Sequence, residues 1–402
     1  MVSFDDIVNA HEKMFGIVHK TTLDFSRTFS EFAHNEVYLK LENLQKTGSF
    51  KVRGSYNKMI TLSKDELKKG VVAASAGNHA QGVAYSSSIL GIPCTIVMPK
   101  GAPLSKVEAT RGYGANVELK GSVFDDALAY ALELNNQTGA AFVHAFDDEA
   151  VIAGQGTVGL EIMDQLPDVD AIVCPVGGGG LISGLAAAVK EKNPTIQIYG
   201  VEAKACPSMA QSLKEKKPIT FDAGPTMADG IAVKTPGERP FQLAQKYVDG
   251  MVSVDETEIA QTMLMLLERN KLLVEGSGAV SLAAMLFQKL PIKNKKVVSV
   301  ISGGNVDVSF VSRIIERGMV EAGRFVRYST ILHDKPGNLE RILQVVTERQ
   351  GNILDISLNH MGDKIYPGYA QMIVSVETRD RQHIEEIFES FKQKGFTTEI
   401  VI

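Results

Sequence analysis

Lys51 lies in the segment GSFKVRG, between Phe50 and Val52. A lysine does covalent chemistry when its amine loses its proton, which desolvation or a neighbouring cation brings about. The two apolar neighbours would desolvate the amine, and Arg53 would supply the positive charge. A lone lysine in a turn is much more often a solvated surface residue. The interpretation of Lys51 as a reactive amine therefore depends on the motifs elsewhere in the chain.

The segment PVGGGGLISGL places four consecutive glycines after an apolar run. Gly177, Gly178, Gly179 and Gly180 are predicted to open a helix, whose unpaired backbone amides form a cradle suited to phosphate. The segment lacks the GK[ST] of a P-loop, and Glu202 is a weak match to the acid of a dinucleotide-binding fold. A tight turn alone does not require four glycines in a row, so we favour phosphate binding.

Two further turns carry polar residues at the ends of apolar runs. In SAGNHAQG, a helix start with Ser75, Asn78 and His79 either holds an anion such as a carboxylate or is simply capped by these side chains. The His79 ring is predicted to be structural rather than a base. In VVSVISGGNVD a strand ends at Ser302, whose hydroxyl is placed to bond a ring ligand. For this motif alone, an ordinary capped turn is the simpler interpretation.

Together, these features meet the needs of pyridoxal phosphate (PLP). This cofactor is held covalently by a lysine and through its phosphate, while a protein group tunes its ring nitrogen. The reactive amine, the glycine cradle, the anion-holding turn and the terminal hydroxyl supply one feature for each requirement. The sequence therefore predicts a PLP site.

The elements that must position these motifs alternate between short apolar runs and longer helical patterns. Continuous apolar runs are typical of strands covered on both faces, and strands that alternate with helices indicate a parallel α/β sheet. Its ligand is expected beyond the carboxyl ends of the strands, where the glycine-rich turns gather. Strands are predicted at 37–41, 70–74, 94–97, 171–176, 196–201 and 296–301, and helices at 125–135, 181–192 and 258–270.

The pattern changes near Gly323. From Phe325 onward the order of elements is βαββαβ, which is ferredoxin-like. We therefore place a boundary at 321–324, between a catalytic domain at 1–322 and a smaller domain at 325–402.

The bulk properties exclude several classes of function. A formal net charge of −5 gives no reason to expect a nucleic-acid partner, and no apolar run reaches the ~18 residues of a membrane span. The three cysteines form no CxxC pair, so we expect reduced thiols in the cytoplasm. The acidic start of the chain predicts no secretory signal.

The segments LENLQKTGSFKVRG, SAGNHAQG, VGGGGL, PTMADGIAV and SGGN, in this order, closely resemble the fold-type II PLP enzymes of the threonine dehydratase (threonine ammonia-lyase) and serine racemase group. The resemblance covers roughly residues 5–320. It implies a two-lobed, tryptophan synthase β-like catalytic part, with a small lobe at roughly 45–150 inserted in a large lobe. The segment LHDKPGNLERI resembles the start of the first helix of a regulatory ACT domain.

The resemblance also implies a role for each motif residue. Lys51 would be the covalent attachment point and base, with Ser75 as a second catalytic residue. Phe50 would pack against the cofactor ring, near Glu275. Asn78 would bond the ring's phenolic oxygen and Ser302 its pyridine nitrogen, while Gly177 to Gly180 hold the phosphate. The substrate carboxylate would be held by Ser75, Asn78 and the backbone amide of His79.

The implied reaction is β-elimination of L-threonine to 2-oxobutanoate and ammonia, with L-serine to pyruvate as a second substrate. Ala76 stands where the racemase has a proton-handling serine, which disfavours racemisation. The alternatives are a racemase, β-replacement or threonine synthesis on the same fold, and a non-catalytic amino-acid sensor. No metal site is predicted.

The tail is predicted to bind an amino-acid effector, isoleucine or valine, or else only to build a homodimer or homotetramer. The sequence leaves both isoleucine biosynthesis and a catabolic role open. The candidate effector residues are Asp334, Gly337, Asn338, Leu339, Asn352 and Ile353.

Overall fold

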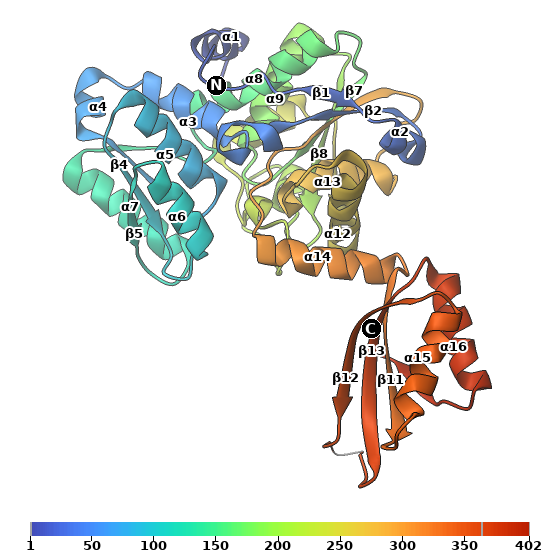
Figure 1. The fold of residues 1–402 in the computed structure, drawn as a ribbon. Coiled ribbons are helices and arrows are strands. Elements are labelled where there is room, and N and C mark those ends of the chain that lie inside the picture. Colours follow the sequence, from blue (N-terminus) through green and yellow to red (C-terminus); the bar gives the residue numbers. More distant parts are fainter. Residues whose placement is uncertain (1, 363–364, 402) are drawn as a thin grey trace. The chain divides into compact units, whose positions relative to one another are not determined.

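The computed structural model describes residues 2–362 and 365–401. The chain divides into two units, Met1–Asp307 and Val308–Ile402, and each is described here by itself. In the first unit, a mostly parallel sheet and a smaller, fully parallel sheet stand side by side, each accompanied by helices (Figure 1). No helix among the described residues is long and apolar enough to cross a membrane.

The larger sheet has six strands in the order β1-β2-β10-β7-β8-β9. All neighbours are parallel except the edge strand β1, which pairs antiparallel with β2. The strands are β1 (Leu23–Phe25), β2 (Glu36–Lys40), β7 (Ala171–Pro175), β8 (Gln197–Ala203), β9 (Gly250–Val254) and β10 (Lys296–Val300).

Helices cover both faces of this sheet, and strand β10 shows how. Val298 and Val300 point into the apolar core that contains α8 (Glu149–Gln165), α9 (Gly180–Lys192) and α11 (Glu238–Tyr247). Ser299 lies on the opposite face, because side chains alternate along a strand. Its hydroxyl is 2.9 Å from that of Ser281 in α13 (Gly276–Leu286). This two-sided burial explains why the strands read as continuous apolar runs.

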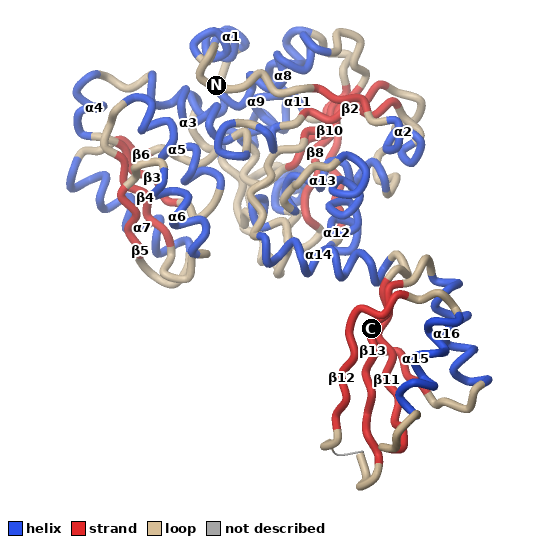
Figure 2. Tube along the Cα trace, in the orientation of Figure 1, coloured by secondary structure: helices blue, strands red, loops and turns tan. Residues whose placement is uncertain are grey.

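The smaller sheet has four parallel strands in the order β5-β4-β3-β6 (Figure 2). Its strands are β3 (Val71–Ala74), β4 (Cys94–Met98), β5 (Asn116–Leu119) and β6 (Ala141–Phe142). The accompanying helices are α3 (Lys51–Ile60), α4 (Lys64–Lys69), α5 (Asn78–Leu90), α6 (Leu104–Gly112) and α7 (Phe124–Thr138). The whole lobe is inserted between β2 and β7 of the larger sheet.

The remaining elements of the first unit lie at the start of the chain and around the larger sheet. They are α1 (Phe4–Lys13), α2 (Arg27–Ala33), α10 (Ser208–Glu215) and α12 (Glu256–Met265), with short turns η1 (Glu42–Leu44), η2 (Lys46–Gly48), η3 (Asp229–Ile231) and η4 (Leu266–Asn270).

The second unit begins with α14 (Val308–Glu321) and continues as βαββαβ. Its antiparallel sheet has the order β12-β13-β11-β14, the split arrangement of a ferredoxin-like fold. The elements are β11 (Phe325–His333), α15 (Asn338–Glu348), β12 (Asn352–Asn359), β13 (Tyr369–Glu377), α16 (Arg381–Gln393) and β14 (Thr398–Ile400). The sequence boundary placed residues up to 322 with the first unit, whereas α14 groups with the second.

Candidate active site

Lys51 begins α3, and its amine is held against the backbone of another segment. Its Nζ donates to the carbonyl of Ala145 at 3.0 Å and lies 5.2 Å from the centre of the Phe50 ring. Burial lowers the pKa of Lys51 to about 8, although the Glu275 carboxylate acts in the opposite direction. A substantial fraction of this amine is therefore neutral near pH 8, as covalent chemistry requires.

Arg53 does not contribute to this lowered pKa, so that part of the sequence prediction is wrong. Its guanidinium is fully buried and bonds Glu42 at 2.8 Å and Glu161 at 2.7 Å. Lys40, also fully buried, bonds the other oxygen of Glu161 at 2.6 Å. The four charges form a closed structural network beneath α3, because two carboxylates balance two cations.

Asn78 is the first residue of α5 and connects to two distant segments. Its Nδ2 donates to Glu275 Oε1 at 2.7 Å, and its Oδ1 accepts from Asn305 Nδ2 at 2.8 Å. Glu275 precedes α13 and also accepts from the hydroxyl of Ser277 at 2.8 Å. Burial raises the pKa of Glu275 to about 7, despite these two donated hydrogen bonds.

Ser302 follows β10 and lies beside the turn that carries Lys51. The amide of Phe50 donates to the Ser302 carbonyl at 3.2 Å, and Ser49 pairs with Gly303 in an isolated bridge. A Cβ on Gly303 would lie 2.5 Å from Glu275 Oε1, so a side chain there would displace that carboxylate. The turn that follows β10 thus contacts both the turn that carries Lys51 and the Asn78–Glu275 pair.

Two of the four glycines pack closely on the segment next to the Lys51 amine. A Cβ on Gly178 would lie 2.4 Å from the ring of Phe146, and one on Gly180 would lie 2.9 Å from the Phe146 Cα. Phe146 follows Ala145, the residue that accepts from Lys51. Within the described chain, the backbone N–H groups of the four glycines donate to no protein acceptor. These donors are free at the start of α9.

The SAGN turn places Ser75 just beyond β3, where its hydroxyl accepts from the amide of Gly77 at 3.1 Å. The ring of His79 is buried and its Nε2 bonds the Val143 carbonyl at 2.8 Å. Burial lowers the pKa of His79 to about 3, so the ring stays neutral. A neutral, buried ring agrees with the structural role predicted for it.

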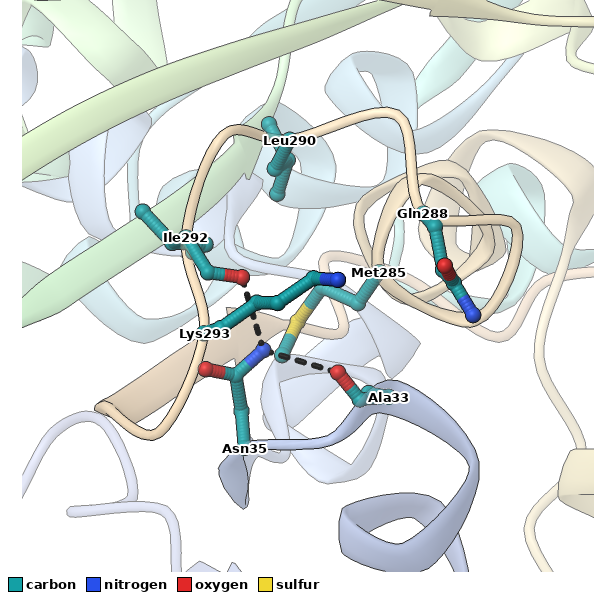
Figure 3. Close-up of a pocket in the computed structure, with 7 residues that line it drawn as sticks. All are labelled: Ala33, Asn35, Met285, Gln288, Leu290, Ile292 and Lys293. Atoms are coloured by element: carbon teal, nitrogen blue, oxygen red, sulfur yellow. Dashed lines mark hydrogen bonds between the residues drawn. The ribbon is translucent and has the colours of Figure 1, made fainter.

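The cavity in Figure 3 lies at the amino-terminal ends of the strands of the larger sheet, and the candidate active site lies at their carboxyl ends. Its lining includes Asn35, which precedes β2, and Lys293, which precedes β10. Lys51, Asn78 and Ser302 instead gather where strands end. A five-residue strand spans roughly 17 Å, so this cavity is separate from the candidate active site. The Asn35 amide nitrogen is already bonded to the carbonyls of Ala33 and Ile292.

The candidate effector residues lie at the two ends of the second unit's sheet. Asp334 follows β11, and its carboxylate lies 3.3 Å from the Nε2 of His360. Gly337 to Leu339 form the start of α15. Asn352 and Ile353 begin β12. Asn352 lies opposite Glu377 of β13, and Glu377 lies opposite Phe325, the first residue of β11. Within one copy, β11 separates the two segments by roughly 27 Å.

Comparison with known proteins identifies the family. Residues 15–303 match the family model of the pyridoxal-phosphate-dependent enzymes. The chain is 51% identical over 401 residues to an L-threonine ammonia-lyase of Thermotoga maritima, with all of both chains covered. It is 48% identical to the catabolic L-threonine dehydratase TdcB of Escherichia coli, over 80% of this chain and 98% of the relative.

Among solved structures, the processed form of threonine deaminase isoform 2 from Solanum lycopersicum superimposes with a TM-score of 0.76, at 39% identity over 79% of this chain and 88% of the other. Maize serine racemase gives 0.75, at 35% identity over 80% and 98%. The chain belongs to the pyridoxal-phosphate-dependent enzymes, in the family that holds the L-threonine ammonia-lyases.

The residues in place fit this cofactor. Four backbone amides without protein partners at a helix N-terminus match a phosphate, and the lowered pKa of Lys51 suits covalent attachment. The hydroxyl of Ser49 is buried and has no bonding partner among the described residues, which leaves it available next to the same turn. Each of these features lies next to the turn that carries Lys51 or next to the Ala145 segment, whose carbonyl accepts a hydrogen bond from the Lys51 amine.

Sequence reasoning missed the contributions of Ala145, Phe146 and Asn305. Ala145 acts through a backbone carbonyl, which no side-chain pattern reveals, and Phe146 matters only through its close packing on the glycines. Asn305 stands in the quoted segment SGGN, yet its partners are 227 and 258 positions away. Only the folded chain brings them together.

Proposed function

We propose that this chain is an L-threonine ammonia-lyase that converts L-threonine to 2-oxobutanoate and ammonia and also accepts L-serine. The observation that carries this proposal is the buried Lys51 amine, hydrogen-bonded to Ala145 and with its pKa lowered to about 8. The full-length likeness to the T. maritima L-threonine ammonia-lyase supports the choice of substrate.

The chain's own residues divide the work as follows. Ser75, Asn78 and the backbone amide of His79 bind the substrate carboxylate at the start of α5, where helix amides favour an anion. Gly177 to Gly180 would hold the cofactor phosphate, and Phe50 would pack against its ring. When bound, PLP supplies the electron sink for charge that develops at the substrate Cα.

Lys51 is the base. Its neutral amine takes the Cα proton, which is general-base catalysis by a lysine with a lowered pKa. Ser302 is an uncharged hydroxyl, so toward the ring nitrogen of bound cofactor it would supply a hydrogen bond without holding a proton there as an aspartate would. Such an arrangement favours prompt loss of the β-hydroxyl group. Ala76 has no proton to give on the opposite side of the substrate, and this disfavours racemisation.

The test is a product assay on a panel of amino acids with the purified enzyme. Threonine should yield equal amounts of 2-oxobutanoate and ammonia, and Lys51→Ala should abolish both. D-allothreonine from L-threonine, or D-serine from L-serine, would instead support a racemase. A requirement for a second substrate would support β-replacement, and turnover of O-phosphohomoserine to threonine would support threonine synthesis. PLP binding without any turnover would support the sensor alternative.

We also propose that the second unit is an ACT domain that binds isoleucine or valine. The segment Asp334–Leu339 offers helix-start amides and a carboxylate to a free amino acid. Because Asn352 and Ile353 lie at the other end of the sheet, one site can contain both segments only if two copies of the chain contribute. A homodimer or homotetramer follows from this proposal. Isoleucine as effector would place the enzyme in isoleucine biosynthesis, and three free buried thiols accord with the cytoplasm.

A further inference from the structure

Asn305 connects three segments around the candidate active site. Its Nδ2 donates to the carbonyl of Thr47 at 2.7 Å and to the Oδ1 of Asn78 at 2.8 Å. Thr47 lies in the turn that leads to Lys51, and Asn78 begins α5 in the smaller lobe. One side-chain amide from the larger lobe therefore bonds both the lysine turn and the helix start that faces it.

The lysine turn needs an external partner because its backbone is strained. Thr47 and Gly48 both adopt the left-handed conformation, with φ of 62° and 71°. For a β-branched residue this conformation is a genuine outlier, and it persists only where the surroundings hold it. The Asn305 bond to the Thr47 carbonyl is such a constraint. Gly48 is also required sterically, since a Cβ there would lie 2.3 Å from Asn305 Oδ1.

Asn305 and Glu275 together fix which way the Asn78 amide points. An asparagine amide has one accepting and one donating end, and the two are nearly equal in shape. Because Asn305 donates to Oδ1, the Nδ2 end of Asn78 faces Glu275, to which it donates at 2.7 Å. Without Asn305, only the bond to Glu275 would hold this orientation. A second Nδ2 hydrogen then remains for the cofactor oxygen.

We propose that Asn305 is a positioning residue that sets the donor direction of Asn78 and fixes the turn before Lys51. The inference rests on the proposed function, since Asn78 and Lys51 are its active-site partners. Asn305 itself touches neither substrate nor reacting atoms in this account. It acts through hydrogen-bond donation, and not by filling space.

The experiment compares Asn305→Asp with Asn305→Ala in the full-length enzyme loaded with PLP. Aspartate has nearly the same shape as asparagine but donates no hydrogen bond. We expect both variants to lower kcat/KM for threonine about tenfold or more, as expected when a buried hydrogen bond is lost. The visible absorption band of bound PLP should shift, and the PLP dissociation constant from equilibrium dialysis should rise. Asn193→Asp, at the end of α9, is the matched control and should change none of these.

Several outcomes would overturn the proposal. Wild-type behaviour of Asn305→Asp beside an impaired Asn305→Ala would mean that the side chain only fills space. Fully multiplicative losses in the Asn78→Ala/Asn305→Ala double variant would mean that the two residues act independently. If a single variant does not fold, the double variant Thr47→Gly/Asn305→Ala takes its place in the spectral and binding measurements, because glycine at position 47 relieves the strained turn.

The same measurements separate this inference from the proposed function. A wild-type enzyme that forms no 2-oxobutanoate refutes the function alone. The absorption band and the PLP dissociation constant still decide the part played by Asn305, because neither requires turnover.

Discussion

The electrostatics of Lys51 give a prediction at the scale of one residue. Its pKa of about 8 means that the amine is protonated at lower pH and neutral above it. In cofactor-free enzyme, competitive labelling by trace acetic anhydride should rise about tenfold per pH unit up to pH 8 and then level off. Mass spectrometry of the Lys51 peptide measures this, with the exposed Lys64 as control for reagent reactivity. A rate that still rises beyond pH 10 would refute the lowered pKa.

Glu275 supplies a second prediction at the same scale. Its carboxylate opposes the effect of burial on Lys51, so it holds the lysine pKa higher than burial alone would. Glu275→Gln removes that charge while preserving shape and the ability to accept from Asn78. The labelling profile of Lys51 should therefore move to lower pH. An unchanged profile would show that the two groups do not interact, and a shift toward higher pH would contradict the sign of the interaction.

At the scale of elements, the buried network beneath α3 holds the helix that carries Lys51. Burial alone would raise the pKa of Glu42, but Arg53 and its other partners outweigh this and hold that pKa below its usual range. A carboxyl whose pKa is lowered on folding stabilises the protein at neutral pH. That contribution is lost as the pH falls through the folded-state value.

Arg53→Met should therefore reduce the free energy of unfolding by about 3–5 kcal/mol at pH 7, because it leaves buried carboxylates short of a cation. Lys58→Met on the same helix is the matched control. The Lys58–Asp148 pair is partly exposed, at 22% and 19%, and should be worth roughly 1 kcal/mol or less. Denaturant unfolding of the two variants measures the difference. Equal losses would mean that the network adds nothing beyond an ordinary surface pair.

The sequence predicted those strands whose burial on both faces produces a continuous apolar run. The six predicted strands correspond to β2, β3, β4, β7, β8 and β10, within two residues at each end, since two-sided burial demands apolar runs. The strands β1 and β6 were not predicted because two or three residues carry no periodicity, and β5 and β9 were not predicted because they are only partly buried.

In the site, the motif residues were predictable from their types. Arg53 was misassigned because its partner Glu161 is 108 positions away.

At the scale of the whole molecule, the E. coli relative indicates that part of the chain is separable. The match takes in 98% of that dehydratase but 80% of this chain, so about a fifth of this chain has no counterpart there. The second unit also has its own apolar core, built from β11, β13 and the two helices of its βαββαβ part. Both observations lead us to expect that catalysis does not require the second unit, whereas control by an effector does.

Deletion of Phe325–Ile402 tests this expectation. The shortened chain should convert threonine with kcat within about threefold of the full-length value, since the candidate active site lies wholly in Met1–Asp307. Isoleucine or valine should shift the threonine saturation curve of the full-length enzyme and leave that of the shortened chain unchanged. An effector regulates only by binding two states of the enzyme unequally, so the shift must disappear with its binding site. Full-length Glu389→Ala, an exposed change on α16, should respond as the wild type does. An effector response that survives the deletion would move the regulatory site into the first unit.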